Sequence, residues 1–223
     1  MSIEEKILKM RREYSGEPLD ESSVDPDPVH QFEKWFEDAV KAEVVDPHAM
    51  VIATATRMGK PTARVVLLRG LDQNGLIFYT GYISRKGIEV LSNPIAAAVF
   101  FWRELDRQIR VEGLIEKVSD AESDKYFQSR PRENQIATWA SSQSQVVVRA
   151  NQFKTSREKL DALFKEFEKK FAGKPVLRPA NWGGFRLKPS SYEFWQGKPG
   201  RLHDRVLYST NENGGWQIDR LAP

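Results

Sequence analysis

The sequence predicts a mainly β protein with flanking helices, of the α+β class, whose strands pair in an antiparallel barrel or sandwich. Three observations lead to this prediction. Between residues 50 and 118, five β-rich runs are separated by Gly, Pro, Asn and Asp, at the spacing of hairpin-linked strands. Asn74-Gly75 lies between two apolar runs, which is a strong hairpin signal because both residues tolerate positive φ. On either side of this block, apolar residues recur at helical spacing.

The chain begins with a polar, proline-bearing stretch. We expect residues 1–26 to form a mobile N-terminal arm or lid with one helical turn, ordered only where something holds it. Asp27 followed by Pro28 is a helix-start signal. The apolar spacing that follows predicts an amphipathic helix over residues 28–44, which Asp46 and the next proline end.

The central block contains the predicted hairpin. Its strands are Arg64–Arg69 and Leu76–Thr80, joined by a turn over Leu71–Gly75 with Asn74-Gly75 at its tip. Ser84 comes next and is predicted to cap a helix over residues 84–92. The predicted strands of the whole block cover residues 50–56, 61–69, 76–81, 95–103 and 107–118.

The second half of the chain alternates helical and strand signals. Ser119 and Glu122 form a capping-box pattern that predicts a helix to about Ser129, where Pro131 stops it. The other predicted elements are a short helix over 133–140, a long amphipathic helix capped by Thr155, and strands over 182–195, 204–210 and 215–220. Because no internal repeat is present and the late strands can complete the early sheet, residues 27–223 are predicted to form a single domain.

Composition excludes several classes of protein. The 223 residues are 40% hydrophobic and 29% charged, as in an ordinary globular protein. The net charge of +3, from 34 basic and 31 acidic residues, is too small to indicate a nucleic-acid partner. The absence of cysteine excludes disulfides, thiolate metal sites and cysteine nucleophiles, and favours the cytoplasm. No apolar run approaches the ~20 residues that cross a membrane, so no membrane association is expected.

Familiar catalytic and metal-binding motifs are also missing from the sequence. It contains no GxGxxG after a strand, no Walker-type loop, no HExxH and no nucleophile elbow. His30, His48 and His203 are far apart and not at metal-ligand spacing, so we expect no metal site.

The first candidate binding residues are four cations in and after the predicted hairpin. Arg64, Arg69, Arg85 and Lys86 sit on or beside apolar strands, and the last two fall in the first turn of the helix after Ser84. Helix N-termini favour anions, and guanidinium groups suit phosphate because they offer several donors in a planar fork. The alternative is that these are solvated cations flanking a half-buried hairpin.

Further polar residues interrupt apolar segments later in the chain. Alternation along the strand over 107–118 places Gln108 and Arg110 on one face. The other candidates are Tyr126, Arg130 and Asn134, spaced by four; Gln143 and Ser144 in a polar loop; and Trp195, Arg201, His203, Asp204 and Arg205 around a Gly/Pro turn. Each has a structural alternative, namely a surface ion pair, a solvated helix face or a core aromatic. Burying so many unpaired charges would cost several kcal/mol each, so they are either exposed or completed by anionic ligands.

These segments together resemble one protein family. The strings occur in the family's order and spacing: RVVLLRG, FYTGYISRKG, RQIRVEG, YFQSRPR, NWGGF and EFWQGKPGRLHDR. They are similar to those of the pyridoxine/pyridoxamine 5′-phosphate oxidases, FMN enzymes of the split-barrel fold, and the match runs from about Arg11 to the C-terminus. The resemblance implies an antiparallel FMN-binding split β-barrel that forms a homodimer, with two FMN sites at the interface.

The resemblance also implies roles for individual residues. It implies cofactor-binding roles for Arg64, Val65, Val66, Leu67, Tyr79, Thr80, Arg85, Lys86, Gln108, Gln143, Ser144, Trp195 and Arg205, part of them from the second subunit. It implies substrate-binding roles for Arg11, Tyr14, Arg69, Tyr126, Arg130, Asn134, Arg201 and His203, with Arg201 and His203 over the reacting ring. The implied reaction oxidises pyridoxamine or pyridoxine 5′-phosphate to pyridoxal 5′-phosphate, with molecular oxygen as the acceptor that yields hydrogen peroxide.

Two positions depart from the family pattern, and one spacing needs an explanation. Position 69 is often Lys in the family and is Arg here; position 134 is typically Ser and is Asn here, which is larger but still donates a hydrogen bond. Arg64 and Arg69 are five residues apart, so a flat strand would point them to opposite faces. If both serve one elongated site, the strand needs a twist, a bulge or a curled end.

Other functions fit part of the same pattern. One is a split-barrel flavoprotein that acts on another substrate, such as a phenazine-pathway oxidase or a flavin reductase. Another is a non-catalytic carrier of flavin or vitamin B6 phosphate, which would bind its ligand without consuming oxygen.

Overall fold

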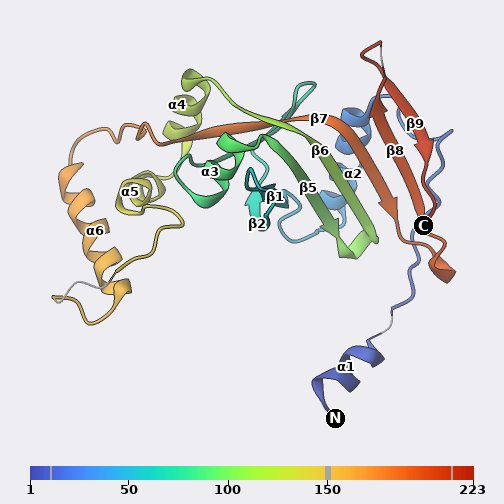
Figure 1. The fold of residues 1–223 in the computed structure, drawn as a ribbon, viewed down its shortest axis with the longest axis horizontal. Coiled ribbons are helices and arrows are strands. Elements are labelled where there is room, and N and C mark those ends of the chain that lie inside the picture. Colours follow the sequence, from blue (N-terminus) through green and yellow to red (C-terminus); the bar gives the residue numbers. More distant parts are fainter. Residues whose placement is uncertain (11, 149–151, 212) are drawn as a thin grey trace. The chain divides into compact units, whose positions relative to one another are not determined.

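The computed structural model describes residues 1–10, 12–148, 152–211 and 213–223 (Figure 1). The helices are α1 (Ile3–Lys9), α2 (Pro28–Lys41), α3 (Arg85–Ser92), α4 (Asp120–Ser129), α5 (Arg132–Ala140) and α6 (Ser156–Lys170), with short 3₁₀ turns η1 (Arg103–Leu105) and η2 (Pro199–Arg201). The strands are β1 (Ala49–Ala55), β2 (Pro61–Leu67), β3 (Gly70–Asp72), β4 (Gly75–Gly81), β5 (Ile95–Trp102), β6 (Arg107–Lys117), β7 (Trp182–Gln196), β8 (Asp204–Thr210) and β9 (Trp216–Arg220).

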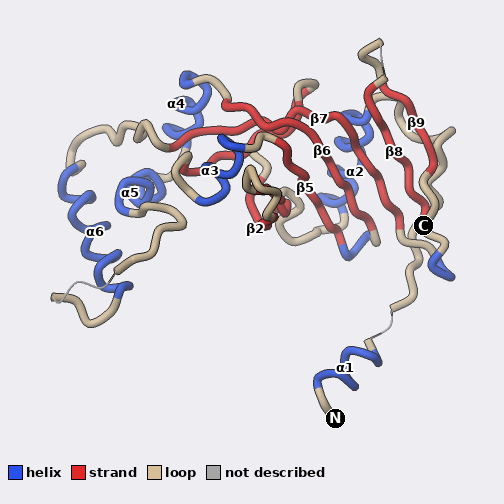
Figure 2. The backbone as a smooth tube through the Cα atoms, in the orientation of Figure 1, coloured by secondary structure: helices blue, strands red, loops and turns tan. Residues whose placement is uncertain are grey.

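The strands belong to one hydrogen-bonded sheet with flanking helices (Figure 2), which confirms the predicted mainly β, α+β class. Its order is β2-β1-β5-β6-β7-β4-β3, and β8 pairs with both β7 and β9. The pairs β3–β4, β4–β7, β7–β8 and β8–β9 are antiparallel. The long strand β7 takes part in two of these pairs: its first part, Trp182–Leu187, pairs with β4, and its last part, Ser191–Gln196, pairs with β8.

The chain divides into two compact units, which are described separately. Unit 1 comprises residues 1–51, 97–112 and 189–223, and unit 2 comprises residues 52–96 and 113–188. No boundary between the units falls at residue 26 or 27. The division into an N-terminal arm and a single domain therefore stays a prediction.

Unit 1 is built around α2. The Asp27 side chain accepts a hydrogen bond from the Val29 amide at 2.8 Å, and Pro28 occupies the first turn, as the start signal predicts. On the buried face of α2, the Phe32 ring lies edge-on to Phe100 of β5, with ring centroids 5.0 Å apart. The helix ends at Lys41, three residues earlier than predicted, because the backbone soon turns into the left-handed region, with φ of 53° at Glu43.

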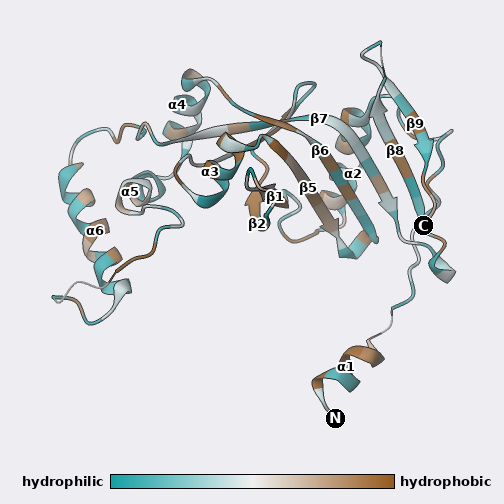
Figure 3. Ribbon diagram, viewed as in Figure 1, coloured by the Kyte–Doolittle hydropathy of each residue, from teal (hydrophilic) through white to brown (hydrophobic). Residues whose placement is uncertain are grey.

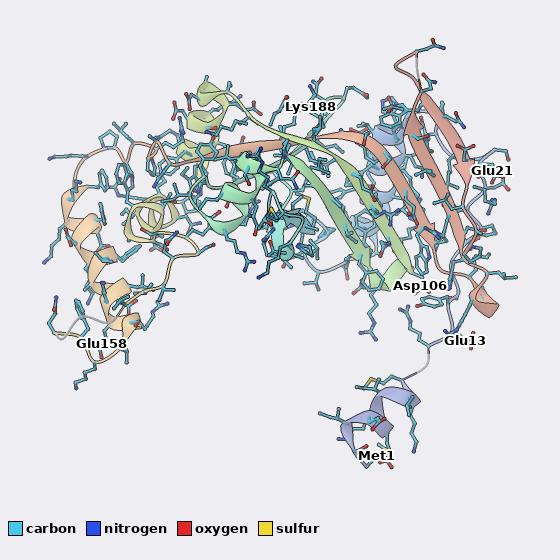
Figure 4. The ribbon with its side chains drawn as sticks, viewed as in Figure 1. Met1, Glu13, Glu21, Asp106, Glu158 and Lys188 are labelled. Carbon is cyan, nitrogen blue, oxygen red and sulfur yellow. The ribbon has the colours of Figure 1, made fainter. Side chains whose placement is uncertain are left out.

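The N-terminal segment is held against unit 1 at several points. Leu19 is buried, and its amide donates to Asp204 at 3.0 Å. The guanidinium of Arg12 lies 2.6 Å from the carboxylate of Asp106, which also accepts the Ser15 amide at 3.2 Å. Figure 4 labels Glu13, Glu21 and Asp106 along this path. The N-terminal segment starts with α1, whose seven residues are more than the single turn predicted; none of them is buried.

Unit 2 contains the predicted hairpin, with a different turn. Asp72 pairs with Gly75, so the two loop residues are Gln73 and Asn74 rather than Asn74 and Gly75. The Asn74 amide binds the Asp72 carboxylate at 2.7 Å, and only Gly75 of the Asn-Gly pair has positive φ, at 121°. The Asp72 side chain therefore shapes the turn through a local hydrogen bond, and the prediction of a turn centred on Asn74-Gly75 was wrong.

Helices and aromatic residues form the core of unit 2 beside β4 and β7. Ser84 caps α3, Ser119 caps α4 and Thr155 caps α6, each through its side-chain oxygen, as the sequence predicts. Phe127 and Trp182 are central to a buried cluster that includes half-buried aromatics of α5 and α6. Strand β5 is the most uniformly apolar strand in sequence (Figure 3), yet Ile95, the first of its two residues in unit 2, is 64% exposed. Within the described residues, no helix is both long enough and apolar enough to pass through a lipid bilayer.

Candidate functional site

Unit 2 contains a cavity of about 880 Å³ between the second half of β2, β4, α3 and the α4–α5 region. The predicted site residues that line it are Arg64, Val65, Val66, Leu67, Arg69, Tyr79, Thr80, Lys86, Tyr126, Arg130, Asn134, Gln143 and Ser144. Residues far apart in sequence therefore meet around one space. The cations that line it come from two separate segments of the chain, the segment from β2 to α3 and the α4–α5 turn.

Lys86 is the most unusual cation of this cavity because it is buried without a carboxylate. Its residue is 6% exposed, and its ammonium donates to Thr80 Oγ1 at 2.9 Å and to Ser84 Oγ at 3.4 Å. Within the described residues no Asp or Glu oxygen lies within 4.0 Å of it. Burial, together with the nearby charge of Arg64, lowers the pKa of Lys86 to about 8. A buried ammonium that has only hydroxyl partners is suited to an anionic ligand.

The hydroxyl and amide groups around Lys86 are arranged by Gln143. The Thr80 hydroxyl donates to Gln143 Oε1 at 2.9 Å, and the Gly81 amide donates to the same oxygen at 3.0 Å. Ser144, the next residue, has a left-handed φ of 68°, which is uncommon for a non-glycine residue and often found at binding sites. The polar loop after α5 is thus tied to β4 beside Lys86.

Arg64 is held by a network behind the cavity wall. Its guanidinium donates to the Ile52 carbonyl at 3.2 Å and to Thr54 Oγ1 at 2.6 Å, and also binds the Thr62 hydroxyl. Glu89 lies 3.4 Å from the same guanidinium and 3.0 Å from that of Arg85.

Glu89 was not predicted from the sequence. Arg85 and Glu89 are four residues apart on a helix, so this spacing could have shown the ion pair between them. The two threonines come from other strands, and no local pattern brings them to Glu89. Arg85 itself faces Glu89, is exposed, and is not among the residues that line the cavity in the described chain.

The second group of cations lies at the α4–α5 turn. Helix α4 ends at Ser129 and α5 begins at Arg132, so Pro131 bends the chain and Tyr126, Arg130 and Asn134 all reach the cavity. The Arg130 guanidinium donates to Thr138 Oγ1 at 2.7 Å. Burial, with the nearby charge of Arg69, lowers the pKa of Arg130 despite the opposing effect of Tyr126.

Aromatic rings form the wall beside Arg130. Tyr79 and Tyr126 stack with centroids 3.7 Å apart and planes 14° apart, and Tyr79 also lies parallel to Trp182 at 5.7 Å. The Arg130 guanidinium lies 4.7 Å from the centre of the Trp182 ring. Thr138 and Trp182 were not predicted. The Trp182 sequence context reads as the start of a buried strand, and nothing near Thr138 indicates that its hydroxyl meets Arg130.

The structure also explains how Arg64 and Arg69 reach one cavity. Strand β2 ends at Leu67, and β3 starts at Gly70, so the predicted continuous strand over 61–69 is broken before Arg69. Beyond the break, the Arg69 amide binds the Ile77 carbonyl at 2.8 Å. The chain turns between the two arginines, and the alternation of a flat strand no longer applies to them.

The remaining predicted residues gather separately, in unit 1. The Tyr14 ring lies edge-on to Trp195 at 5.6 Å and to His203 at 5.0 Å, and Trp195 and His203 are 4.7 Å apart. The Lys198 amide donates to His203 Nδ1 at 3.1 Å. Since an amide can only donate, Nδ1 carries no proton and the proton of the neutral ring is on Nε2. Arg201, exposed in the η2 turn, has a left-handed φ of 62°.

Glu193 organises two arginines of unit 1. It accepts a hydrogen bond from Arg205 Nε at 2.8 Å and lies 2.6 Å from Arg110 Nη2. The hydrogen bond to Glu193 raises the pKa of Arg205. Gln108 is half-buried on the same strand as Arg110, two residues before it. Arg11 lies outside the described residues. Among those described, no group of three or more His, Asp or Glu side chains is placed to hold a metal ion.

Comparison with known proteins finds two family models along the chain. The model described as pyridoxamine 5′-phosphate oxidase matches residues 36–164, and one described as the pyridoxine 5′-phosphate oxidase C-terminal dimerisation region matches residues 182–223.

Curated relatives match over nearly the whole chain. A pyridoxine/pyridoxamine 5′-phosphate oxidase of Cupriavidus metallidurans is 48% identical over 98% of this chain and 99% of its own. One of Rubrobacter xylanophilus is 49% identical over 97% of this chain and 96% of its own.

Solved structures share the fold. PhzG from Burkholderia lata, in complex with tetrahydrophenazine-1-carboxylic acid, superposes with a TM-score of 0.85 at 31% identity, covering 94% of this chain and 100% of that one. A pyridoxamine 5′-phosphate oxidase-related, FMN-binding protein from Nostoc punctiforme superposes with a TM-score of 0.65 at 17% identity, covering 90% of this chain and 99% of that one. At this identity the second likeness concerns the fold alone.

Proposed function

Because the chain belongs to the pyridoxamine 5′-phosphate oxidase family, we propose that it oxidises pyridoxamine 5′-phosphate and pyridoxine 5′-phosphate to pyridoxal 5′-phosphate. The proposed cofactor is FMN, and the proposed acceptor is molecular oxygen, which leaves as hydrogen peroxide. The observation that carries the proposal is the cavity of unit 2, where a buried, carboxylate-free Lys86 and a second cation group around Arg130 line one space. Two separated cation groups suit two phosphorylated ring compounds bound together.

The residues around Lys86 fit the phosphate of FMN. Lys86 and Arg64 supply charge, Thr80 and Ser144 supply hydroxyl groups, and each of these four lines the cavity. Arg85 is assigned to this phosphate by the family resemblance, and it reaches Glu89 on the same helix. Val65, Val66, Leu67 and Tyr79 are proposed to line the ring and the ribityl chain. When bound, the flavin supplies the acceptor for a hydride equivalent from the substrate and passes two electrons to oxygen.

The residues around Arg130 fit the phosphate of the substrate. Arg69, Tyr126, Arg130 and Asn134 all line the cavity. Thr138 and Trp182 fix Arg130 from two directions, by a hydrogen bond of 2.7 Å and by a ring contact of 4.7 Å, so its guanidinium is oriented before a ligand arrives. Holding both reactants in place can supply roughly 7–11 kcal/mol of barrier reduction.

Arg201 and His203 are proposed to act on the substrate ring. His203 is held by the Lys198 amide at Nδ1, so its neutral ring presents an N–H donor at Nε2. That donor can orient a polar substituent of the substrate, and Arg201 is proposed to help orient the substrate and stabilise the charge that develops as the hydride equivalent leaves. Tyr14 packs against His203 and is proposed, with Arg11, to belong to a lid over the substrate.

We propose that the protein is a homodimer in which part of each cofactor site comes from the second protomer. Gln108, Trp195 and Arg205 belong to that shared part with Gln143. Two observations support an extensive protein interface: residues 182–223 match a family model described as a dimerisation region, and unit 2 exposes large apolar side chains. They include Val65, Ile83, Ile88, Leu91, Ile95 and Leu114, each at least 42% exposed. A cytoplasmic location stays a prediction.

One observation favours a second candidate function. PhzG, at 31% identity, was solved in complex with tetrahydrophenazine-1-carboxylic acid, so a related scaffold binds a compound without phosphate. An oxidase acting on such a compound would have little use for the oriented Arg130 with its neighbours Arg69 and Thr138. We therefore prefer the phosphorylated substrate.

The test begins with the absorption spectrum of the purified protein and continues with oxygen uptake. The proposal predicts a yellow protein that consumes oxygen and forms hydrogen peroxide when pyridoxamine 5′-phosphate is added. A yellow protein that consumes no oxygen with either phosphorylated vitamer would instead be a flavin or vitamin B6 carrier. A colourless protein that does not bind added FMN would contradict the proposal at its first step.

A further inference from the structure

The network behind Arg64 contains a carboxylate at a place where the cavity is expected to bind an anion. Glu89 is 4% exposed and sits on the inner face of α3, one turn after Lys86. A carboxylate without cationic partners this close to a phosphate site would repel the ligand. The groups that contact Glu89 therefore decide its effect on the site.

Each oxygen of Glu89 has partners that fix a particular arginine. Oε2 accepts hydrogen bonds from Thr54 at 2.6 Å and Thr62 at 2.5 Å, and it lies 3.4 Å from Arg64 Nη2. The same two hydroxyls accept from Arg64, which closes a ring of hydrogen bonds around its guanidinium. Oε1 accepts from Arg85 Nε at 3.0 Å.

The ionisation state of Glu89 follows from these contacts. Burial opposes its charge, but the hydrogen bonds from Thr54, Thr62 and Arg85, with the charge of Arg64, outweigh burial and lower the pKa of Glu89 to about 2. The carboxylate is thus charged at neutral pH. Arg64, Arg85 and Lys86 carry three positive charges against this single negative one, which leaves a local net charge of +2. A phosphate monoester carries roughly −1.5 to −2 at pH 7, so the local charges match.

We propose that Glu89 is a positioning residue of the anion site: it holds the guanidinium groups of Arg64 and Arg85 in place and leaves Lys86 as the cation whose charge is not neutralised by a carboxylate. The two cations then differ in role. The ion pair with Glu89 fixes the guanidinium of Arg64 and weakens its attraction for an anion, whereas Lys86, which has hydroxyl partners only, keeps its full attraction for the ligand. This inference rests on the proposed function, since it concerns the site assigned there to the FMN phosphate.

Glu89→Ala and Glu89→Gln separate positioning from simple neutralisation. In Glu89→Ala the ring of hydrogen bonds around Arg64 loses its central acceptor, and Arg85 loses its partner. In Glu89→Gln the amide oxygen can still accept from the threonines, but the amide N–H group faces the N–H of Arg85. Positioning therefore predicts that Gln rescues part of what Ala loses, whereas neutralisation predicts the same gain in anion affinity for both variants.

The experiment titrates flavin-free protein with FMN and, separately, with riboflavin, which lacks the phosphate, and follows quenching of flavin fluorescence. We expect Glu89→Ala to weaken FMN binding about tenfold, the loss of one charge-assisted hydrogen bond. Riboflavin binding should change less than about twofold, because nothing else in the ring-binding wall contacts Glu89. Glu89→Gln should lie between Ala and the unaltered protein. Glu168→Gln, an exposed position on α6, is the charge-matched control and should change neither constant.

Other outcomes overturn the inference in distinguishable ways. Tighter FMN binding in both variants would mean that Glu89 only lowers the positive charge. Equal losses for FMN and riboflavin would mean a purely structural role, and a circular dichroism melt would show it. If the unaltered protein did not prefer FMN to riboflavin, the proposed function would itself be wrong, and the inference with it. If the preference existed and survived in Glu89→Ala, only the inference would fail.

Discussion

Replacing Lys86 by Met should change stability and cofactor affinity in opposite directions. Met keeps most of the volume of the buried side chain but removes the ammonium group. In the ligand-free protein that ammonium is buried with hydroxyl partners alone, at 2.9 Å from Thr80 and 3.4 Å from Ser84. The structure therefore contains a charge that weakens the fold and is expected to bind the phosphate of FMN.

The size of the stability effect follows from the pKa of Lys86. Burial lowers this pKa from 10.5 to about 8. Because the folded chain holds the proton less tightly than the unfolded one, the charge destabilises the fold fully below pH 8, and stability increases as the pH rises from about 8 to 10.5. At neutral pH the penalty is on the order of 3 kcal/mol. Met removes it but loses two hydrogen bonds of about 1 kcal/mol each, so we expect a net gain of about 1–2 kcal/mol.

Two assays measure the two effects. Thermal unfolding of the flavin-free protein followed by circular dichroism should show a Tm increase of about 2–8 °C for Lys86→Met, from about 2–4 °C per kcal/mol at this chain length. Fluorescence titration with FMN should show a loss of about 1.5–3 kcal/mol, which is about 10- to 150-fold in Kd. Lys165→Met, at an exposed position of α6, is the control and should affect neither quantity.

Three results would contradict these two effects of Lys86. If Lys86→Met lowered the Tm of the flavin-free protein, the ammonium would be stabilised by its surroundings, and the argument from burial would be wrong. If FMN affinity were unchanged, the buried charge would have another purpose than binding phosphate. A lower FMN affinity with equally lower riboflavin affinity would point to damage of the whole cavity.

Other predictions concern the same site and its neighbours. Arg64→Ala should yield protein that loses FMN on gel filtration, since it removes a cation and opens the threonine network; a protein that stays yellow would contradict this. His203→Ala should purify yellow but turn over slowly, and full kcat/KM would disprove the role given to its Nε2 donor. Thr138→Val should raise the KM for pyridoxamine 5′-phosphate several-fold with little change in FMN affinity, because Arg130 loses its 2.7 Å hydrogen bond. FMN affinity should fall as the pH rises above about 8, since only protonated Lys86 attracts phosphate, and Lys86→Met should abolish that dependence.

Local chemistry in the sequence accounts for most helix starts. The caps at Asp27, Ser84, Ser119 and Thr155 are side chains that satisfy amides one turn ahead, so a short window of sequence predicts them. Helix ends were less predictable. The end of α2 depends on a left-handed φ at Glu43, a residue type that does not signal this conformation.

The hairpin shows how one hydrogen bond changes a turn. Asn74-Gly75 indicates a hairpin correctly, but the Asp72 carboxylate binds the Asn74 amide and moves the loop one residue earlier. Alternation of side chains alone could likewise not predict that the strand ends at Leu67. The spacing of Arg64 and Arg69 did show that a flat strand was impossible if both line one site.

The sequence indicates the cations that line the cavity, but it does not indicate the residues that hold them in place. Lys86 and Arg130 stand out as cations in apolar segments. Thr138, Trp182 and Glu89 do not, because their importance comes from contacts across 8, 52 and about 25 positions of the chain. Such contacts are fixed by the sheet and the helix packing, which no local pattern contains.

The two cation groups of the cavity are proposed to select compounds that carry phosphate. Oxygen uptake by the FMN-loaded protein should therefore be compared between pyridoxamine 5′-phosphate and pyridoxamine, which lacks the phosphate. We expect rapid uptake with the first compound and, at equal concentration, a rate at least about tenfold lower with the second, from the loss of charge-assisted contacts to Arg130 and its neighbours. Equal rates with the two amines would contradict this proposal.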